Sequence, residues 1–247
     1  MEDVPDNPAT RLLDFLTKLK SYGADAQVRI SICRALDLDT DMPLPEVLHY
    51  LTVVMSWPDE IESLVNGLTE VNKVRLLRWR PHIDETMVGL AHLTAPLQST
   101  LAQYNVTDLT DLEHCADTLH FRAPEPVMTT EKLDDLGALI RQAIDAVIAD
   151  TDLTDEARHW LVTQLRDVEQ AVIHFRIAGY RGVEEAMERL CGGMARRPEA
   201  QNPETAGWFM KIWNKFMLGL TGVEKLGTAS QSVFGMLEAG SDFLNGS

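Results

Sequence analysis

EKLDDLGALIRQAIDAVIA, residues 131–149, has the most regular apolar pattern of this 247-residue chain. Its apolar side chains recur every three or four residues, which is the spacing of one face of a helix. They are Leu133, Leu136, Ile140, Ile144, Val147 and Ile148. Glu131, Asp134 and Asp135 fall in the first turn, where the positive end of the helix dipole stabilises acids. The stretch therefore predicts an amphipathic helix that packs by its apolar face.

A second helix follows after a few polar residues. Thr154 is suited to cap it, and Gly179 is expected to end it. Its apolar positions are Trp160, Leu161, Leu165, Val168, Val172 and Phe175. Gly182 is expected to provide a tight turn into a short helix at 183–191. Because the connection between the first two helices is short, they are expected to form an antiparallel hairpin.

The N-terminal half repeats the helical spacing in shorter pieces. Asn7 and Pro8 form an N-cap and first-position pair, and the spacing continues from there to Gly23. Pro45 is expected to open a further helix, and Pro58 is expected to end it. Nothing alternates with a period of two for long, as a strand would require. The pattern predicts an all-α protein, a multi-helix bundle with a C-terminal amphipathic helical arm.

Two stretches rich in proline or glycine divide the chain, RAPEPVMTT and GGMARRPEAQNPETAG. The predicted organisation is an N-terminal helical region at 1–121, a linker at 122–130, a helical hairpin plus short helix at 131–191, a second linker at 192–206, and an amphipathic, small-residue-rich arm at 207–247.

The charge of the chain argues against partners rich in phosphate. It carries 38 acids against 22 lysines and arginines, a formal net charge of −16. Such a body repels nucleic acid, so no nucleic-acid partner is predicted. The start MEDVPDNPAT resembles neither a signal nor a transit peptide, and three widely separated cysteines suit reduced thiols. These features predict a cytoplasmic location.

The sequence shows no recognisable catalytic or metal-binding motif. No two of its seven histidines lie three or four residues apart, as a helical metal site requires. His114, Cys115 and His120 lie near acids, yet the two histidines point to different faces of a helix. Glu46 and His49 have the spacing of a di-iron ligand pair but no second copy. No catalytic, cofactor-binding or metal-ligating residue and no cofactor is predicted, and an enzyme whose groups come from distant helices is the third hypothesis for function.

IAGYRGVEEA, residues 177–186, resembles the Gly-x-x-Gly loop of KH domains, which clamps a nucleic-acid backbone. The strands that flank this loop in the family are missing here. Glu184 and Glu185 follow the loop and would repel phosphate. The structural interpretation, a helix end followed by a turn, is therefore preferred.

RLLRWRP, residues 75–81, is the basic cluster of the N-terminal part. It places Arg75, Arg78 and Arg80 around Trp79. Such a cluster can stack on a base, but in an acidic chain its default partners are nearby carboxylates. The favoured interpretation is surface ion pairing.

GWFMKIWNKFMLGL, residues 207–220, contains two lysines and no acid. On a helix its lysines Lys211 and Lys215 fall opposite or at the edge of an apolar arc. The arc contains Trp208, Phe209, Ile212, Trp213, Phe216, Met217 and Leu220. Charges interrupt the segment before it is long enough to span a bilayer. Further on, Gly235 and Ala239 have the spacing of closely packed helices.

This pattern is typical both of helices that dock on protein and of helices that lie on a membrane surface. The first hypothesis is a non-enzymatic scaffold or adaptor, whose arm docks on its own body, on a second copy in a homo-oligomer, or on a protein partner. The alternative is an effector that associates with or disrupts a membrane, peripheral at its inner face. In that case anionic liposomes should bind the arm and release it as salt rises.

Overall fold

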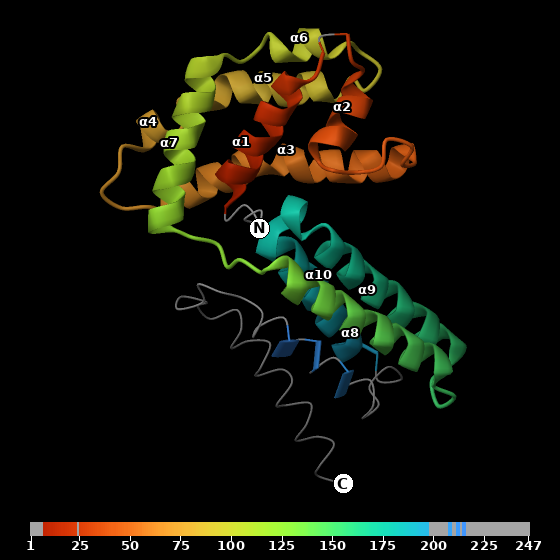
Figure 1. Cartoon of the computed structure of the whole chain (residues 1–247). Coiled ribbons are helices and arrows are strands. Elements are labelled where there is room, and N and C mark those ends of the chain that lie inside the picture. Colours follow the sequence, from red (N-terminus) through yellow and green to blue (C-terminus); the bar gives the residue numbers. More distant parts are fainter. Residues whose placement is uncertain (1–6, 24, 198–206, 209–210, 213, 216–247) are drawn as a thin grey trace. The chain divides into compact units, whose positions relative to one another are not determined.

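The computed structural model describes residues 7–23, 25–197, 207–208, 211–212 and 214–215 (Figure 1). Within these residues the regular secondary structure is helical, with isolated bridge positions at Gln27, Pro96 and Val127. The predicted all-α, multi-helix bundle is therefore confirmed. The chain divides into an N-terminal unit, Pro5–Glu125, and a C-terminal unit that includes Pro126–Ser247. The division falls inside the stretch RAPEPVMTT.

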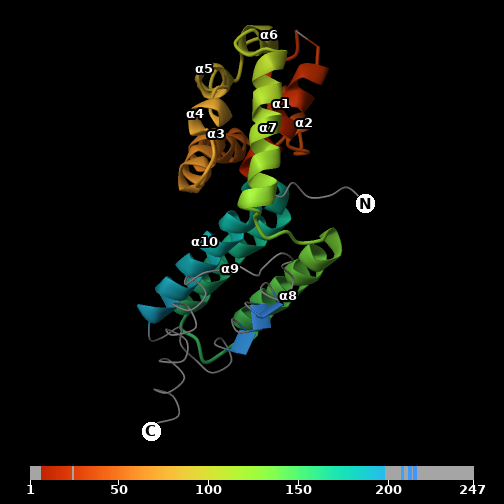
Figure 2. The ribbon, with the colours of Figure 1, turned by 90° about the vertical axis from the view of Figure 1, so that its left-hand side faces the viewer.

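The N-terminal unit is built around its first helix. Its elements are α1 (Pro8–Ser21), α2 (Val28–Ala35), α3 (Leu44–Gly67), α4 (Lys73–Leu76), α5 (Arg80–Leu90), α6 (Leu97–Leu101) and α7 (Val106–Arg122). α1 packs against α2, α3 and α7 (Figure 2). The buried face of α1 includes Leu12, Phe15, Leu16 and Leu19. This spacing places the four side chains on one side of the helix, which explains why three neighbours can cover it.

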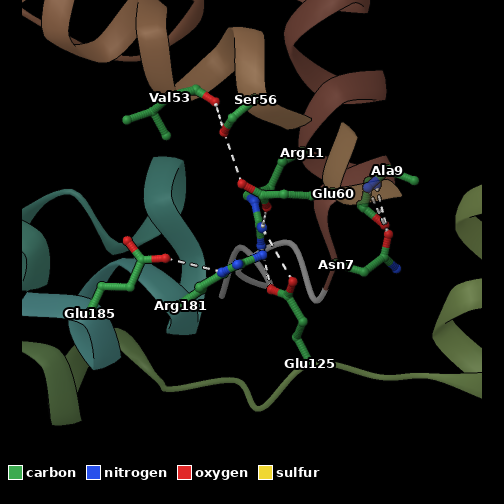
Figure 3. Close-up of polar contacts among 10 residues, drawn as sticks. Asn7, Ala9, Arg11, Val53, Ser56, Glu60, Glu125, Arg181 and Glu185 are labelled. Atoms are coloured by element: carbon green, nitrogen blue, oxygen red, sulfur yellow. Dashed lines mark hydrogen bonds and ion pairs between the residues drawn. The ribbon is translucent and has the colours of Figure 1, made fainter. Parts of the chain in front are cut away.

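The predicted cap of α1 is confirmed. The Asn7 side chain accepts hydrogen bonds from the backbone amides of Ala9 and Thr10, each at 3.0 Å (Figure 3). Its Nδ2 donates to the carbonyl of Ala116 in α7 at 3.3 Å. Asn7 therefore satisfies the free amides of the helix end and also ties that end to a neighbouring helix.

The prediction that Pro58 ends a helix is wrong, because α3 continues through it to Gly67. A proline inside a helix removes one hydrogen bond and costs about 3 kcal/mol. Trp57 and Ile61 on either side are buried, and the Trp57 ring meets that of Phe15 edge to face, with centroids 6.0 Å apart. Packing of this buried face offsets the local cost, so tertiary contacts override the proline.

The C-terminal unit contains α8 (Thr130–Ala149), α9 (Asp155–Ile173) and α10 (Phe175–Ala195). α9 packs against both α8 and α10 (Figures 1 and 2). Thr154 caps α9 as expected, its side chain accepting from the amide of Ala157 at 3.2 Å. Of the six apolar positions expected to face the core in α8, four are buried; Leu133 is half-buried and Ile148 is exposed.

The expected boundary between α9 and the next helix is wrong. α9 ends at Ile173, and α10 begins at Phe175 and runs to Ala195, past the expected short helix and into the expected linker at 192–206. Gly179 does adopt a positive φ of 64°, but within α10, where it marks a kink. Gly182 is helical rather than a turn, and the methyl of Ala178 leaves no room for a side chain there. The positive φ of Gly179 is therefore as expected, whereas its place inside a helix is not.

Candidate interaction surface of the C-terminal segment

The described part of the C-terminal segment, residues 207–208, 211–212 and 214–215, is helical. Ile212 is 0% exposed and belongs to the apolar core that α8, α9 and α10 form. Trp208 is half-buried and packs against the same core. Lys211 and Asn214, which lie outside the predicted apolar arc, are exposed. The segment therefore turns this part of its apolar face toward its own C-terminal unit.

One ion pair joins the segment to α8. Nζ of Lys215 lies 2.9 Å from Oδ2 of Asp135. A second charged contact stays within the segment, because Nζ of Lys211 lies 4.5 Å from the centre of the Trp208 ring. Trp208, Ile212 and Lys215 have the i, i+4, i+7 spacing by which a helix presents anchors to a groove.

The contacts of the segment differ in how much free energy they contribute to docking. Burying an isoleucine side chain contributes about 1.5–3 kcal/mol. A solvent-exposed ion pair such as Lys215–Asp135 contributes about 0.2–1 kcal/mol. Ile212 is therefore the main anchor, and Lys215 mainly sets the position of the segment along α8.

The structure thus brings together four of the residues predicted for this surface, Trp208, Lys211, Ile212 and Lys215. The others lie outside the described residues: Phe209, Trp213, Phe216, Met217, Leu220, Gly235 and Ala239. Sequence reasoning missed Asp135 as the acceptor for Lys215. In the sequence, Asp135 was recognisable only as an acid near the start of the most regular helix. The favourable interaction of acids with the helix dipole already explains an acid at that position.

A hollow of about 420 Å³ lies in the C-terminal unit beside the end of α10. Its lining residues are Trp160, Gly193, Arg196 and Arg197. The Arg197 guanidinium stacks over the Trp160 ring at 5.3 Å and lies 3.5 Å from the Glu156 carboxylate. Nε of Arg196 donates to the carbonyl of Gly192 at 3.0 Å. These contacts are internal to the unit, and they hold the end of α10 against α9.

The thiols of the chain are poorly suited to nucleophilic chemistry. Burial raises the pKa of Cys115 to about 11 and that of Cys191 to about 12. Burial also raises the pKa of Cys33. Since the thiolate is the nucleophile, all three remain thiols at neutral pH. Among the residues that the structure describes, no three histidine, cysteine, aspartate or glutamate side chains are grouped to hold a metal ion.

The basic cluster at 75–81 behaves as a surface pairing site. Trp79 is fully buried, so its ring is not available to stack on a base. Arg80 donates to the carbonyl of Pro58 and forms ion pairs with the carboxylates of Asp59, Glu62 and Asp84. Arg80 thereby links the first turn of α5 to the second half of α3.

An exposed histidine makes one of the ion pairs of the N-terminal unit. Nδ1 of His82 lies 2.7 Å from Oδ1 of Asp108, whose other oxygen accepts from the backbone amide of Asn105 at 2.8 Å. The hydrogen bond to Asp108, reinforced by its charge, raises the pKa of His82 above the ordinary value of 6.5. A raised pKa in the folded state means that the pair stabilises the protein fully below about pH 6.5 and loses this effect as pH rises through the folded-state pKa.

We therefore expect His82→Gln to lower the free energy of unfolding more at pH 6 than at pH 8.5. Urea denaturation of wild type and variant at both pH values measures this difference. His92→Gln changes another exposed histidine and serves as the matched control, with an effect expected to stay within about 0.5 kcal/mol. A His82→Gln effect that is equal at both pH values, or larger at pH 8.5, contradicts the assignment.

No protein-family model matches this chain, and comparison with curated proteins and with solved structures gives no match either. Within the described residues, every helix is too short or too polar to cross a bilayer.

Proposed function

We propose that the protein is a non-enzymatic helical adaptor of the cytoplasm, whose C-terminal segment mediates self-association or docking to a protein partner. The observation that carries this proposal is the burial of Ile212 in the core of α8–α10. It supports the proposal because the C-terminal unit offers a surface that covers an amphipathic, aromatic helix.

The composition of the segment supports the same function. Between Lys215 and the next acid, Glu224, the sequence adds further large apolar residues, among them Phe216, Met217 and Leu220. Aromatic residues and methionine are enriched in the centres of protein interfaces. Lysines at the edge of the arc meet acidic protein surface, as the Lys215–Asp135 pair illustrates.

Mass measurements in solution test this function. We expect light scattering to give an oligomer, or a partner-bound complex from lysate, for the full chain, and neither for a chain that ends at Pro198. Changing Trp208, Trp213 and Phe216 to serine in the full chain should remove the same association. Phe121→Ser changes an aromatic residue that is 80% exposed on α7 and is the control, expected to leave association intact.

Two results would contradict the proposal. One is an unchanged mass and an unchanged set of partners after truncation. The other is binding of the full chain to anionic liposomes, falling with salt and lost in the triple-serine variant, without any protein complex. The second result would support the membrane-associating alternative, since charge attraction to anionic lipid is screened by salt.

A further inference from the structure

We infer that the C-terminal segment is exchanged between two copies of the chain, so that α8–α10 of one copy binds Trp208, Ile212 and Lys215 of the other. This inference rests on the proposed self-association and names its partner and its contacts. Exchange of an identical element between protomers is a common route to symmetric dimers, because it creates no contact that the single copy lacks.

The contacts made by the described residues of the segment are each weak enough to open. One fully buried side chain, one half-buried ring and one exposed ion pair hold the described residues. By the magnitudes given above, burial of Ile212 and the Lys215–Asp135 pair together contribute a factor of roughly ten to a thousand to the ratio of docked to undocked segment. Each of these contacts is non-covalent and small, so it can open and form again with the binding surface on α8–α10 of a second copy.

Charge favours a second copy as the occupant. Residues 207–220 carry two lysines and no acid. The start of α8, which receives Lys215, presents the exposed acids Glu131, Asp134 and Asp135. The segment and its binding surface are therefore complementary, and every copy of the chain carries both.

The concentration of the protein sets the ratio between the single-copy arrangement and the exchanged dimer. The contacts are the same whether the segment comes from its own chain or from another, and eleven residues, 196–206, lie between the end of α10 and the segment. A short connection of this kind gives an effective concentration on the order of millimolar. We therefore expect the single-copy arrangement at about 10 μM and a growing share of exchanged dimer from several hundred micromolar upward.

Cross-linking between positions 135 and 215 tests the exchange in the full chain. One sample carries both Asp135→Cys and Lys215→Cys in the same chain, and a second sample mixes chains that carry one change each. A short bis-maleimide joins the two new thiols. Wild type gives the background, which is expected to be low because the native thiols are buried or half-buried with raised pKa values. A mixture of Asp135→Cys with Val74→Cys, at an 85% exposed position of α4, measures random collision.

The expected result is an intrachain product in the double variant at low concentration and an interchain 135–215 product in the mixture. The interchain product should grow at least tenfold between 10 and 500 μM and exceed the collision control. Lack of both the intrachain product in the double variant and the interchain product in the mixture would contradict the docking contact and therefore the inference. Lack of the interchain product at every concentration would overturn the exchange.

Light scattering on the same samples separates failure of the exchange from failure of the proposed function. A dimer without an interchain 135–215 product overturns the exchange and leaves self-association standing. A monomer at every concentration, together with no interchain product, overturns both the exchange and self-association.

Discussion

Replacing Phe15 with alanine is expected to lower the free energy of unfolding of the N-terminal unit by about 3–5 kcal/mol. Phe15 is 1% exposed, and its ring packs edge to face on Trp57 at a centroid distance of 6.0 Å. The substitution removes the buried ring and leaves a cavity where α1 meets α3. Urea denaturation followed by tryptophan fluorescence measures the loss, because Trp57 lies next to the changed side chain.

Phe121→Ala provides the matched control. It makes the same chemical change in another helix of the same unit, but Phe121 is 80% exposed. Its effect is expected to stay within about 0.5 kcal/mol. Similar losses for the two variants would show that Phe15 does not occupy the core as the structure places it.

Replacing Arg11 with methionine is expected to lower the free energy of unfolding by about 2–4 kcal/mol. The Arg11 side chain is 2% exposed; its Nη1 lies 2.7 Å from the Glu125 carboxylate, and its Nη2 lies 4.0 Å from that of Glu60 (Figure 3). Glu60 also accepts from the Ser56 hydroxyl at 2.8 Å. Methionine fills a similar space but removes the buried positive charge. The largely buried carboxylates of Glu60 and Glu125 then lose the positive charge that compensates them. Thermal or urea denaturation measures the loss.

Arg181→Met is the control for this change. Arg181 is 59% exposed and pairs with Glu185 one turn along α10, with Nε 3.1 Å from the carboxylate oxygen (Figure 3). Surface pairs of this spacing contribute about 0.3–0.5 kcal/mol, so the control variant should remain close to wild type. An Arg11→Met loss no larger than that of Arg181→Met would contradict a structural role for the buried ion cluster.

The candidate surface could be read only in part from the sequence. The periodicity of residues 207–220 identified Trp208 and Ile212 as members of an apolar face and Lys211 as lying outside it. That pattern specifies which side of a helix avoids water but not what covers it. The cover for Ile212, the core of α8–α10, and the acceptor for Lys215, Asp135 on α8, are distant in sequence. Trp79 and Arg80 show the same limit of what a local pattern specifies. They are adjacent in the chain, yet Trp79 is fully buried whereas Arg80 forms ion pairs with three acids.

Local sequence was enough to establish that the protein is helical, where α1 and α9 begin and which face of α8 is buried. Caps such as Asn7 and Thr154, and the spacing of Leu136, Ile140 and Ile144, act within one or two turns, so their physics is contained in neighbouring residues. Only the tertiary structure decided that α3 continues through Pro58, that α10 contains both Gly179 and Gly182, and that Ile212 lies inside the C-terminal unit. Each of these outcomes depends on packing against residues that are distant in the sequence. The free energy of this packing outweighs the local preference, and it produces no periodic pattern in the sequence.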